Sequence, residues 1–287
     1  MTARVERFAP SPTGRLHLGH AFSALTAWDE AQRADGVFRL RIEDIDSGRA
    51  RPGFEAAIYE DLRWLGLMWP EPPLRQSERL GAYEAALARL DAMGLTYRCA
   101  CTRRDILEAA DAPQEGAVDG VVYPGTCKAT PPDASRPHAV RLDMARALAV
   151  AATEAGAASL GFEETGAGPE GETGWISLSA LRLEATAGDV VLARKDIPTS
   201  YHLAVVVDDA FEGVTHVTRG EDLFGATGVH VLLQTLLGLP RPIYRHHRLI
   251  RDETGRRLAK RADDVALGAL RAAGWTPADV RRAVGLD

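Results

Sequence analysis

Two periodicities of apolar and polar positions divide the first part of the chain into strands and helices. "VERF" at 5–8 predicts a short buried strand, because Val5 and Phe8 bracket charged residues and a proline-rich break follows. Apolar residues then recur at helical spacing from Leu18 onward, which predicts a helix over 18–34. The unit is therefore a strand, a Pro/Gly loop and a helix.

The same patterns continue along the rest of the chain. They predict further strands near 37–42, 190–194, 203–207 and 214–218, and further helices at 53–65, 79–93, 103–110 and 226–237. Strands and helices alternate at first, a cysteine-bearing segment follows, and the strand pattern then resumes. This order predicts an α/β sheet interrupted by an inserted subdomain. An Ala/Gly/Glu-rich stretch at 147–174 looks like a variable insertion.

Composition limits the class of protein. The chain has 287 residues, of which 46% are hydrophobic, enough for one large domain or two ordinary ones. No apolar run approaches the roughly 18 residues that span a membrane, and "MTARVERFAP" lacks the apolar core of a secretion signal. We therefore expect a globular, cytoplasmic protein with no membrane partner. We also expect a monomer.

The formal charge of −6 is concentrated in one region. Residues 154–189 contain seven acidic side chains and one basic side chain, so the rest of the chain is balanced. Residues 241–261 contain eight arginine or lysine side chains and two acidic ones. A solvated surface and a contact with phosphate or RNA are equally plausible explanations of this basic run.

Two histidines, His17 and His20, lie three residues apart where the first predicted helix begins. A helix start offers unpaired N–H groups and a partial positive charge, and Gly14 and Gly19 allow a ligand to approach the backbone. The motif matches neither of the two common glycine-rich phosphate loops. A helix cap or a half-buried ring would explain a single histidine, but two on one face favour a phosphate site.

Charged side chains follow two of the predicted strands. "RIEDID" ends a strand with Glu43, Asp44 and Asp46, where ligands of open α/β sheets bind, so we expect Glu43 to bind a substrate ammonium group. The alternative is an acidic capping loop. "VTRGEDL" provides Arg219 at a strand edge, where its guanidinium would bind a substrate carboxylate, unless it pairs with its acidic neighbours at 221 and 222.

The three cysteines, Cys99, Cys101 and Cys127, fall in one short segment. An odd number of cysteines in a reducing compartment disfavours disulfides, and their thiolates would bind zinc if a fourth ligand were present. His138 and Tyr123 are both candidates for that ligand, and spacing alone does not decide between them. Three small buried thiols are the alternative to a metal site.

Near the end of the chain, "RLAKRADD" predicts a basic loop. The simplest interpretation is an exposed loop. The functional one is a mobile arm whose Lys260 neutralises charge on a transferred or leaving phosphate.

Taken in order, "PSPTGRLHLGH", "RIEDID", "VTRGEDL" and "RLAKR" resemble the catalytic domain of class I aminoacyl-tRNA synthetases of the glutamyl type. The resemblance covers most of the chain. It implies a Rossmann-type parallel sheet with an inserted zinc-bearing subdomain and a short helical C-terminal segment. The family's signature motifs correspond to 17–20 and 257–261. Arg257 and Ala259 replace the usual lysine and serine of the second motif, so Lys260 is expected to do most of its work.

The resemblance also implies the role of each site residue. ATP, with Mg²⁺, would be a substrate bound by His17, Gly19, His20 and Lys260, and the two histidines and the lysine would be catalytic. Glutamate would be bound by residues that include two fixed cations and one anion: Arg7, Phe8, Ala9, Pro10, Ser11, Glu43, Tyr201 and Arg219. One structural zinc would be bound by Cys99, Cys101, Tyr123 and Cys127.

Length favours one branch of this family. Only 26 residues follow Arg261, whereas a glutamyl-tRNA synthetase continues into a large helical anticodon-binding domain. A short chain with a CxC and YxxxC segment resembles the glutamyl-queuosine tRNA(Asp) synthetases. That branch activates L-glutamate and transfers it to queuosine in the anticodon of tRNA(Asp), so the expected partner is an anticodon stem-loop that carries queuosine.

Two other functions stay open. One is a minimal glutamyl-tRNA synthetase that charges a tRNA 3′ end, and the other is a catalytically inactive module that binds tRNA or ATP. The predicted domain boundaries are 1–95 for the first half of the nucleotide-binding domain, 96–188 for the inserted subdomain, 189–240 for the second half, and 241–287 for the basic loop and C-terminal helices.

Overall fold

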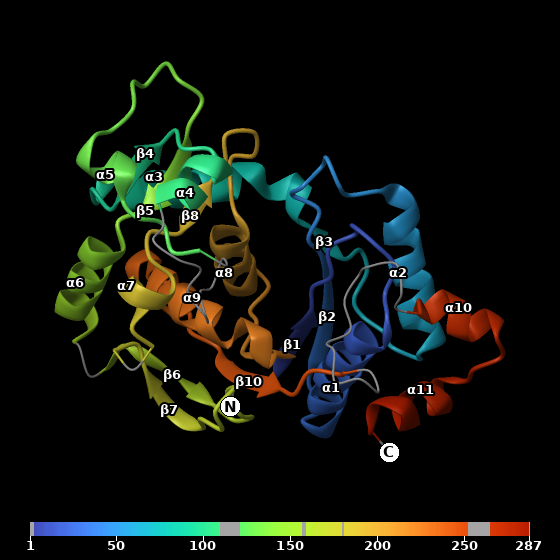
Figure 1. The fold of residues 1–287 in the computed structure, drawn as a ribbon. Coiled ribbons are helices and arrows are strands. Elements are labelled where there is room, and N and C mark those ends of the chain that lie inside the picture. Colours follow the sequence, from blue (N-terminus) through green and yellow to red (C-terminus); the bar gives the residue numbers. More distant parts are fainter. Residues whose placement is uncertain (1–2, 110–120, 157–158, 180, 252–264, 287) are drawn as a thin grey trace.

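A computed structural model describes residues 3–109, 121–156, 159–179, 181–251 and 265–286 (Figure 1). Parallel strands form the centre of the molecule. β1 (Val5–Phe8) pairs with β2 (Val37–Ile42), and β2 pairs with the short β3 (Leu74–Arg75). A second group has the order β7-β6-β10-β9, in which β9 (His216–Gly220), β10 (Ile243–His247) and β6 (Gly161–Glu164) are parallel and β7 (Gly174–Ser177) is antiparallel.

The two groups of strands meet where β9 lies beside β1. The backbone N–H of Thr215 donates to the carbonyl of Val5 at 3.0 Å, and the N–H of Val5 donates to the Thr215 hydroxyl at 2.8 Å. The chain therefore reverses its direction of travel across the sheet between β1 and β9. Ligands of open α/β sheets bind beyond the carboxyl ends of strands at such a reversal. The predicted parallel α/β sheet is confirmed.

Helices cover the sheet and divide its apolar residues into two large clusters. One cluster packs β1 and β2 against α1, α2, α10 and α11, and the other packs the second group of strands against α3, α8 and α9. The bounds are α1 (Leu18–Arg33), α2 (Pro52–Trp64), the 3-10 turn η1 (Gln76–Arg79), α3 (Leu80–Ala92), α8 (Tyr201–Phe211), the 3-10 turn η3 (Glu221–Leu223), α9 (Phe224–Leu237), α10 (Leu267–Ala272) and α11 (Pro277–Val284).

The strand predicted at 203–207 is wrong, because these residues lie in the middle of α8. The run of Val205, Val206 and Val207 suggested a strand, but seven of the eleven positions of the helix are buried. A helix that is apolar on most of its faces carries no 3.6-residue pattern, so a short buried helix and a buried strand look alike in the sequence.

The cysteine-bearing segment forms a second, smaller sheet at the upper left of Figure 1. Its three antiparallel strands are β4 (Thr96–Cys99), β5 (Ala139–Leu142) and β8 (Val191–Ala193). The helices of this region are α4 (Arg103–Ala109), α5 (Thr126–Ala129), α6 (Met144–Ala155) and α7 (Leu183–Thr186). An insertion between the two halves of the main sheet is thus present, while the exact domain boundaries stay a prediction.

Part of the stretch 147–174 belongs to the main sheet. Its strand β6 pairs with β10, and the side chain of Phe162 is fully buried in the larger apolar cluster. The stretch therefore contributes to the core, which its Ala/Gly/Glu-rich composition did not indicate. Among the described helices, none combines the length and apolar character that a bilayer span requires.

Candidate active site

A cleft of about 1020 Å³ separates the main sheet from the smaller sheet. Its first wall includes Ser11, Glu43 and Tyr201, which come from the ends of β1 and β2 and the start of α8. Its second wall includes Cys101, Tyr123 and Arg141 of the cysteine-bearing region. Three of the predicted glutamate-binding residues therefore face one cavity at the carboxyl ends of the strands.

The two histidines of the first motif cap α1. Nδ1 of His17 accepts from the backbone N–H of Gly19 at 3.1 Å, and Nδ1 of His20 accepts from the backbone N–H of His17 at 3.2 Å. A neutral imidazole that accepts through Nδ1 carries its hydrogen on Nε2, so both rings are N–H donors at Nε2. The histidines therefore do cap the helix, as expected for a histidine at this position. The same contacts fix the two Nε2–H donors at the start of α1.

Gly19 is needed for this arrangement. A Cβ atom at position 19 would lie 3.0 Å from Cε1 and 3.1 Å from Nδ1 of His17, closer than side chains normally pack. The ring centroids of His17 and His20 are only 3.8 Å apart, so the two rings contact each other over the first turn of α1. Glycine therefore allows the two rings to share the first turn of the helix.

Lys260 and Arg257 lie outside the described residues. The chain that follows them is described, and it returns to the histidines. Ala266 forms a β-bridge with His17, and the N–H of Leu267 donates to the carbonyl of Leu16 at 2.8 Å. The described residues Ala266 and Leu267 therefore lie beside the first motif.

A buried ion network connects Glu43 with Arg7 through two residues that the sequence analysis did not select. Arg41, which is fully buried, donates to Asp209 at 2.7 Å and lies 3.4 Å from the Glu43 carboxylate. Asp209 also accepts from Nε of Arg7 at 3.3 Å. Alternating charges thus run from the cleft wall into the sheet.

Burial is the largest influence on the carboxylates of this network. It raises the pKa of Glu43, and the opposing charges of Arg41 and Arg7 do not cancel the effect. Burial also acts to raise the pKa of Asp209, but the guanidinium groups of Arg41 and Arg7 outweigh it and lower that pKa. The neighbouring guanidinium groups therefore favour the charged form of Asp209, while Glu43 is the group whose charge would gain most from a bound ammonium.

Arg219 has a different environment. It is 4% exposed on β9, and its partners are hydroxyl groups and imidazoles: Tyr201 at 3.4 Å, Thr227 at 2.5 Å, His230 at 3.2 Å and His246 at 3.3 Å. Within the described residues it forms no ion pair, and neither Glu221 nor Asp222 neutralises it. A buried cation without an anion is a strong attractor for a carboxylate.

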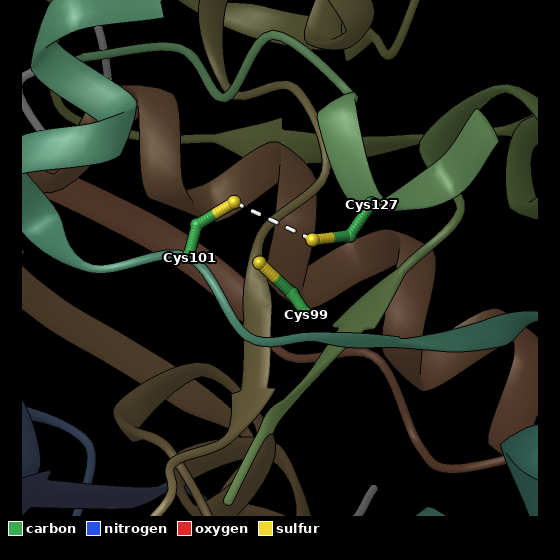
Figure 2. Close-up of side chains that lie close together, drawn as sticks. All are labelled: Cys99, Cys101 and Cys127. Atoms are coloured by element: carbon green, nitrogen blue, oxygen red, sulfur yellow. Dashed lines mark hydrogen bonds between the residues drawn. The ribbon is translucent and has the colours of Figure 1, made fainter. Parts of the chain in front are cut away.

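The three cysteines converge, as Figure 2 shows. Their sulfur atoms lie within 4.8 Å of one another, and Sγ of Cys101 is 3.4 Å from Sγ of Cys127. The hydroxyl of Tyr123 joins them at 3.5 Å from Cys101 and accepts from the N–H of Cys127 at 2.7 Å. His138 instead contacts the carbonyl of Arg136, so the structure brings Tyr123 and not His138 to the cysteines.

This cluster fits a zinc ion. With Zn–S bonds of about 2.3 Å and a Zn–O bond of about 2.1 Å, a tetrahedral site requires edges of about 3.5 to 3.8 Å. The two edges that involve Cys101, at 3.4 and 3.5 Å, are close to that size. Burial acts to raise the pKa of Cys127, but hydrogen bonds from Tyr123 and Cys101 outweigh it and lower that pKa to about 7.

The residues that sequence reasoning missed share one kind of signal. Arg39 and Arg41 alternate along β2 with apolar residues on its other face, so they had to lie on the same face as the selected Glu43 and find partners there. Arg41 finds them in Asp209 of α8 and in Glu212, the residue directly after that helix. No pattern in the sequence indicated that His246 and Thr227 lie against Arg219.

The chain matches the family model described as "tRNA synthetases class I (E and Q), catalytic domain" over residues 4–286. The chain belongs to this family. It is 56% identical to a glutamyl-Q tRNA(Asp) synthetase of Rhodobacter capsulatus, over 98% of this chain and 100% of that protein. A glutamyl-Q tRNA(Asp) synthetase of Symbiobacterium thermophilum is 43% identical, over 96% of this chain and 83% of that one. These matches place the chain in the glutamyl-Q branch.

Solved structures agree with this classification. A glutamate tRNA ligase of Elizabethkingia meningosepticum, solved with its amino acid, has a TM-score of 0.66 and 25% identity over 96% of this chain. This chain spans about half of that structure, 54%. A methionyl-tRNA synthetase of Mycobacterium tuberculosis, bound to methionyl-adenylate, has a TM-score of 0.60 at 12% identity, covering 99% of this chain and 64% of that one, and shows the same fold. The expected class I synthetase fold is confirmed.

Proposed function

We propose that this protein is an ATP-dependent ligase that activates L-glutamate as glutamyl-adenylate and transfers the glutamate to queuosine in the anticodon of tRNA(Asp). One observation carries the proposal: in a chain of the glutamyl-Q branch, Glu43 and Tyr201 line one cleft, and Tyr201 contacts the fixed cation of Arg219. Ser11 and Thr13 line the same cleft and lead to the histidine-capped start of α1. Those are the groups that glutamate and ATP require.

The amino acid would be bound by opposite charges at its two ends. Arg219 offers a cation that no described carboxylate neutralises, and Arg7 shares its charge with Asp209. Glu43 lies on the cleft wall and offers an anion for the α-ammonium group. The segment from Phe8 to Ser11 continues β1 into the cleft and is tied to Glu43, whose N–H donates to the carbonyl of Pro10 at 3.1 Å.

ATP would bind at the start of α1, where Gly19 lets the phosphates approach the backbone and His17 and His20 present their Nε2–H groups. The glutamate carboxylate attacks the α-phosphate, a bond to pyrophosphate breaks, and negative charge grows on the phosphate oxygens. The Nε2–H groups of the two histidines and the ammonium group of Lys260 would stabilise that charge. No protein side chain forms a covalent bond, so positioning and electrostatics provide the rate. Mg²⁺ supplies charge neutralisation on the phosphates when bound.

Zinc would have a structural role here. Cys99, Cys101, Tyr123 and Cys127 provide four ligands, which complete a tetrahedral site and leave no position for substrate. The ligands come from β4, the chain that follows it, and the start of α5, so one ion would join separate segments of the cleft's second wall.

Activation is expected to proceed without RNA. Every described residue assigned to glutamate and ATP lies on the two halves of one sheet or on the helices against it. Glutamate-dependent exchange of labelled pyrophosphate into ATP should therefore appear with protein, glutamate, ATP and Mg²⁺ alone. An exchange signal that required added tRNA would contradict this assignment of the site.

Loss of one zinc ligand is expected to destabilise the cysteine-bearing region. Metal analysis of protein purified without chelator should give about one zinc per chain. Cys127→Ser should lower both the zinc content and the Tm, because the binding free energy of a structural metal is also folding free energy. Thr126→Ser, at an exposed neighbour on α5, is the matched control and should change neither. Metal-free wild-type protein with an unchanged Tm would instead favour three buried thiols.

A further inference from the structure

Arg219 lies at the centre of a buried hydrogen-bond network that is built from five elements, its own strand β9 included. Two imidazoles and a hydroxyl surround it: His246 on β10, and His230 and Thr227 on α9. Glu164 on β6 stands behind His246, and His202 on α8 stands behind His230. All six side chains are at least nine-tenths buried, so each hydrogen atom in the network has to be used.

The hydrogen positions follow from the partners. The Glu164 carboxylate contacts Nδ1 of His246, and a carboxylate only accepts, so Nδ1 carries the hydrogen. Nε2 of the neutral ring is then a bare acceptor, and it faces the Nε–H of Arg219 at 3.3 Å. Nδ1 of His230 likewise accepts from Arg219, which leaves the Nε2 hydrogen of His230 to donate to Nδ1 of His202 at 3.2 Å.

This arrangement fixes the guanidinium without neutralising it. Most buried arginines are anchored by carboxylates, as Arg41 is by Asp209 and Glu212. Neutral acceptors orient the planar fork and leave its charge available to a ligand. Burial, followed by the charge of Arg219, lowers the pKa of His230 well below its ordinary value, so that ring stays neutral.

We propose that His246, with its tautomer set by Glu164, and His230 and Thr227 are positioning residues that aim Arg219 at a carboxylate of the glutamate substrate. The inference rests on the proposed function. If these residues position Arg219, the affinity for glutamate depends on whether Nδ1 or Nε2 of His246 carries the hydrogen. Glu164, which sequence analysis assigned to a variable insertion, would then act on the amino-acid site through two other residues.

Glu164→Gln tests the tautomer directly. One oxygen of Glu164 accepts from the backbone N–H groups of Gly166, at 2.7 Å, and of His246, at 2.9 Å. The single oxygen of a glutamine is needed to accept from these two N–H groups, so its NH₂ group faces Nδ1 of His246. The hydrogen of the ring moves to Nε2, which lies 2.9 Å from the Thr227 hydroxyl oxygen and can donate to it, but which can no longer accept from the Nε–H of Arg219.

The expected result is a rise in the KM for glutamate of roughly 10- to 100-fold in pyrophosphate exchange, the range for loss of a hydrogen bond to a charged group. The kcat and the KM for ATP should stay within a few-fold of wild type, because the interaction is lost equally in the ground and transition states. Nitrogen NMR of the imidazoles should show the hydrogen of His246 on Nδ1 in the wild type and on Nε2 in the variant. Glu163→Gln, at the exposed neighbour on β6, is the control and should change none of these.

A second variant covers the case in which Glu164→Gln does not fold. Thr227→Val keeps the shape of the side chain and removes the hydroxyl that accepts from Nη2 of Arg219 at 2.5 Å. It should raise the KM for glutamate while the His246 hydrogen stays on Nδ1. A wild-type KM for glutamate in Thr227→Val, or in a Glu164→Gln variant whose tautomer has changed, would overturn the inference. Failure of the wild type to exchange pyrophosphate with glutamate would instead overturn the proposed function, and this inference with it.

Discussion

Replacing Lys260 with alanine is expected to slow glutamyl-adenylate formation by roughly 10²- to 10³-fold, the typical loss for one electrostatic donor that acts in the transition state. The reason is that its charge is needed when negative charge moves onto the leaving pyrophosphate. The KM for glutamate should change little, because glutamate is assigned to Arg7, Glu43 and Arg219. Pyrophosphate exchange at saturating ATP measures the rate, and its dependence on glutamate measures the KM.

Arg257→Ala is the comparison for this variant, since Arg257 stands where the family's motif normally has a lysine. It should cost less than Lys260→Ala. An exchange rate within a few-fold of wild type for Lys260→Ala would remove that residue from the mechanism. A larger loss in Arg257→Ala would assign its role to Arg257.

The second large effect concerns the RNA. An isolated tRNA(Asp) anticodon stem-loop that carries queuosine is expected to accept glutamate, whereas the same stem-loop with unmodified guanosine should accept none. The acceptor group belongs to the modification, so its absence removes the reaction and does not merely weaken binding. Phosphate contacts should make the activity fall steeply with added salt. Labelled glutamate retained by each stem-loop is the measurement.

The matched control is full-length tRNA(Asp) whose 3′ terminus has been removed. It should accept as much glutamate as the intact tRNA, because the anticodon is the proposed site of transfer. Equal labelling of the guanosine stem-loop would contradict the assignment to queuosine.

Much of the fold could be predicted from the sequence because its helices are amphipathic and its strands are bounded by clear breaks. The helix that starts at Leu18 was predicted to within one residue of its end. Helix α8 was missed because it is buried on most faces and contains three successive valines, so that no periodicity remained. β6 was hidden in a stretch whose Ala/Gly/Glu-rich composition resembled a surface insertion.

Some residues of the candidate site could likewise be predicted from the sequence, and others could not. Residues in local motifs, such as His17, His20 and Glu43, could be selected because their chemistry depends on spacing along a few residues. The partners of Arg219 come from four separate elements, and no local pattern connects Glu164 with His246 across 82 positions. The choice of Tyr123 over His138 as neighbour of the cysteines likewise depended on the resemblance, because spacing allowed both.

The central claim is that glutamate ends on the anticodon. Intact tRNA(Asp) that carries queuosine should be incubated with the protein, ATP, Mg²⁺ and labelled glutamate, then digested to nucleosides, so that the labelled nucleoside can be identified. Label is expected on queuosine alone. Label on the 3′-terminal adenosine would contradict it and establish an enzyme that charges the 3′ end, and a tRNA without label would leave a module that binds tRNA or ATP.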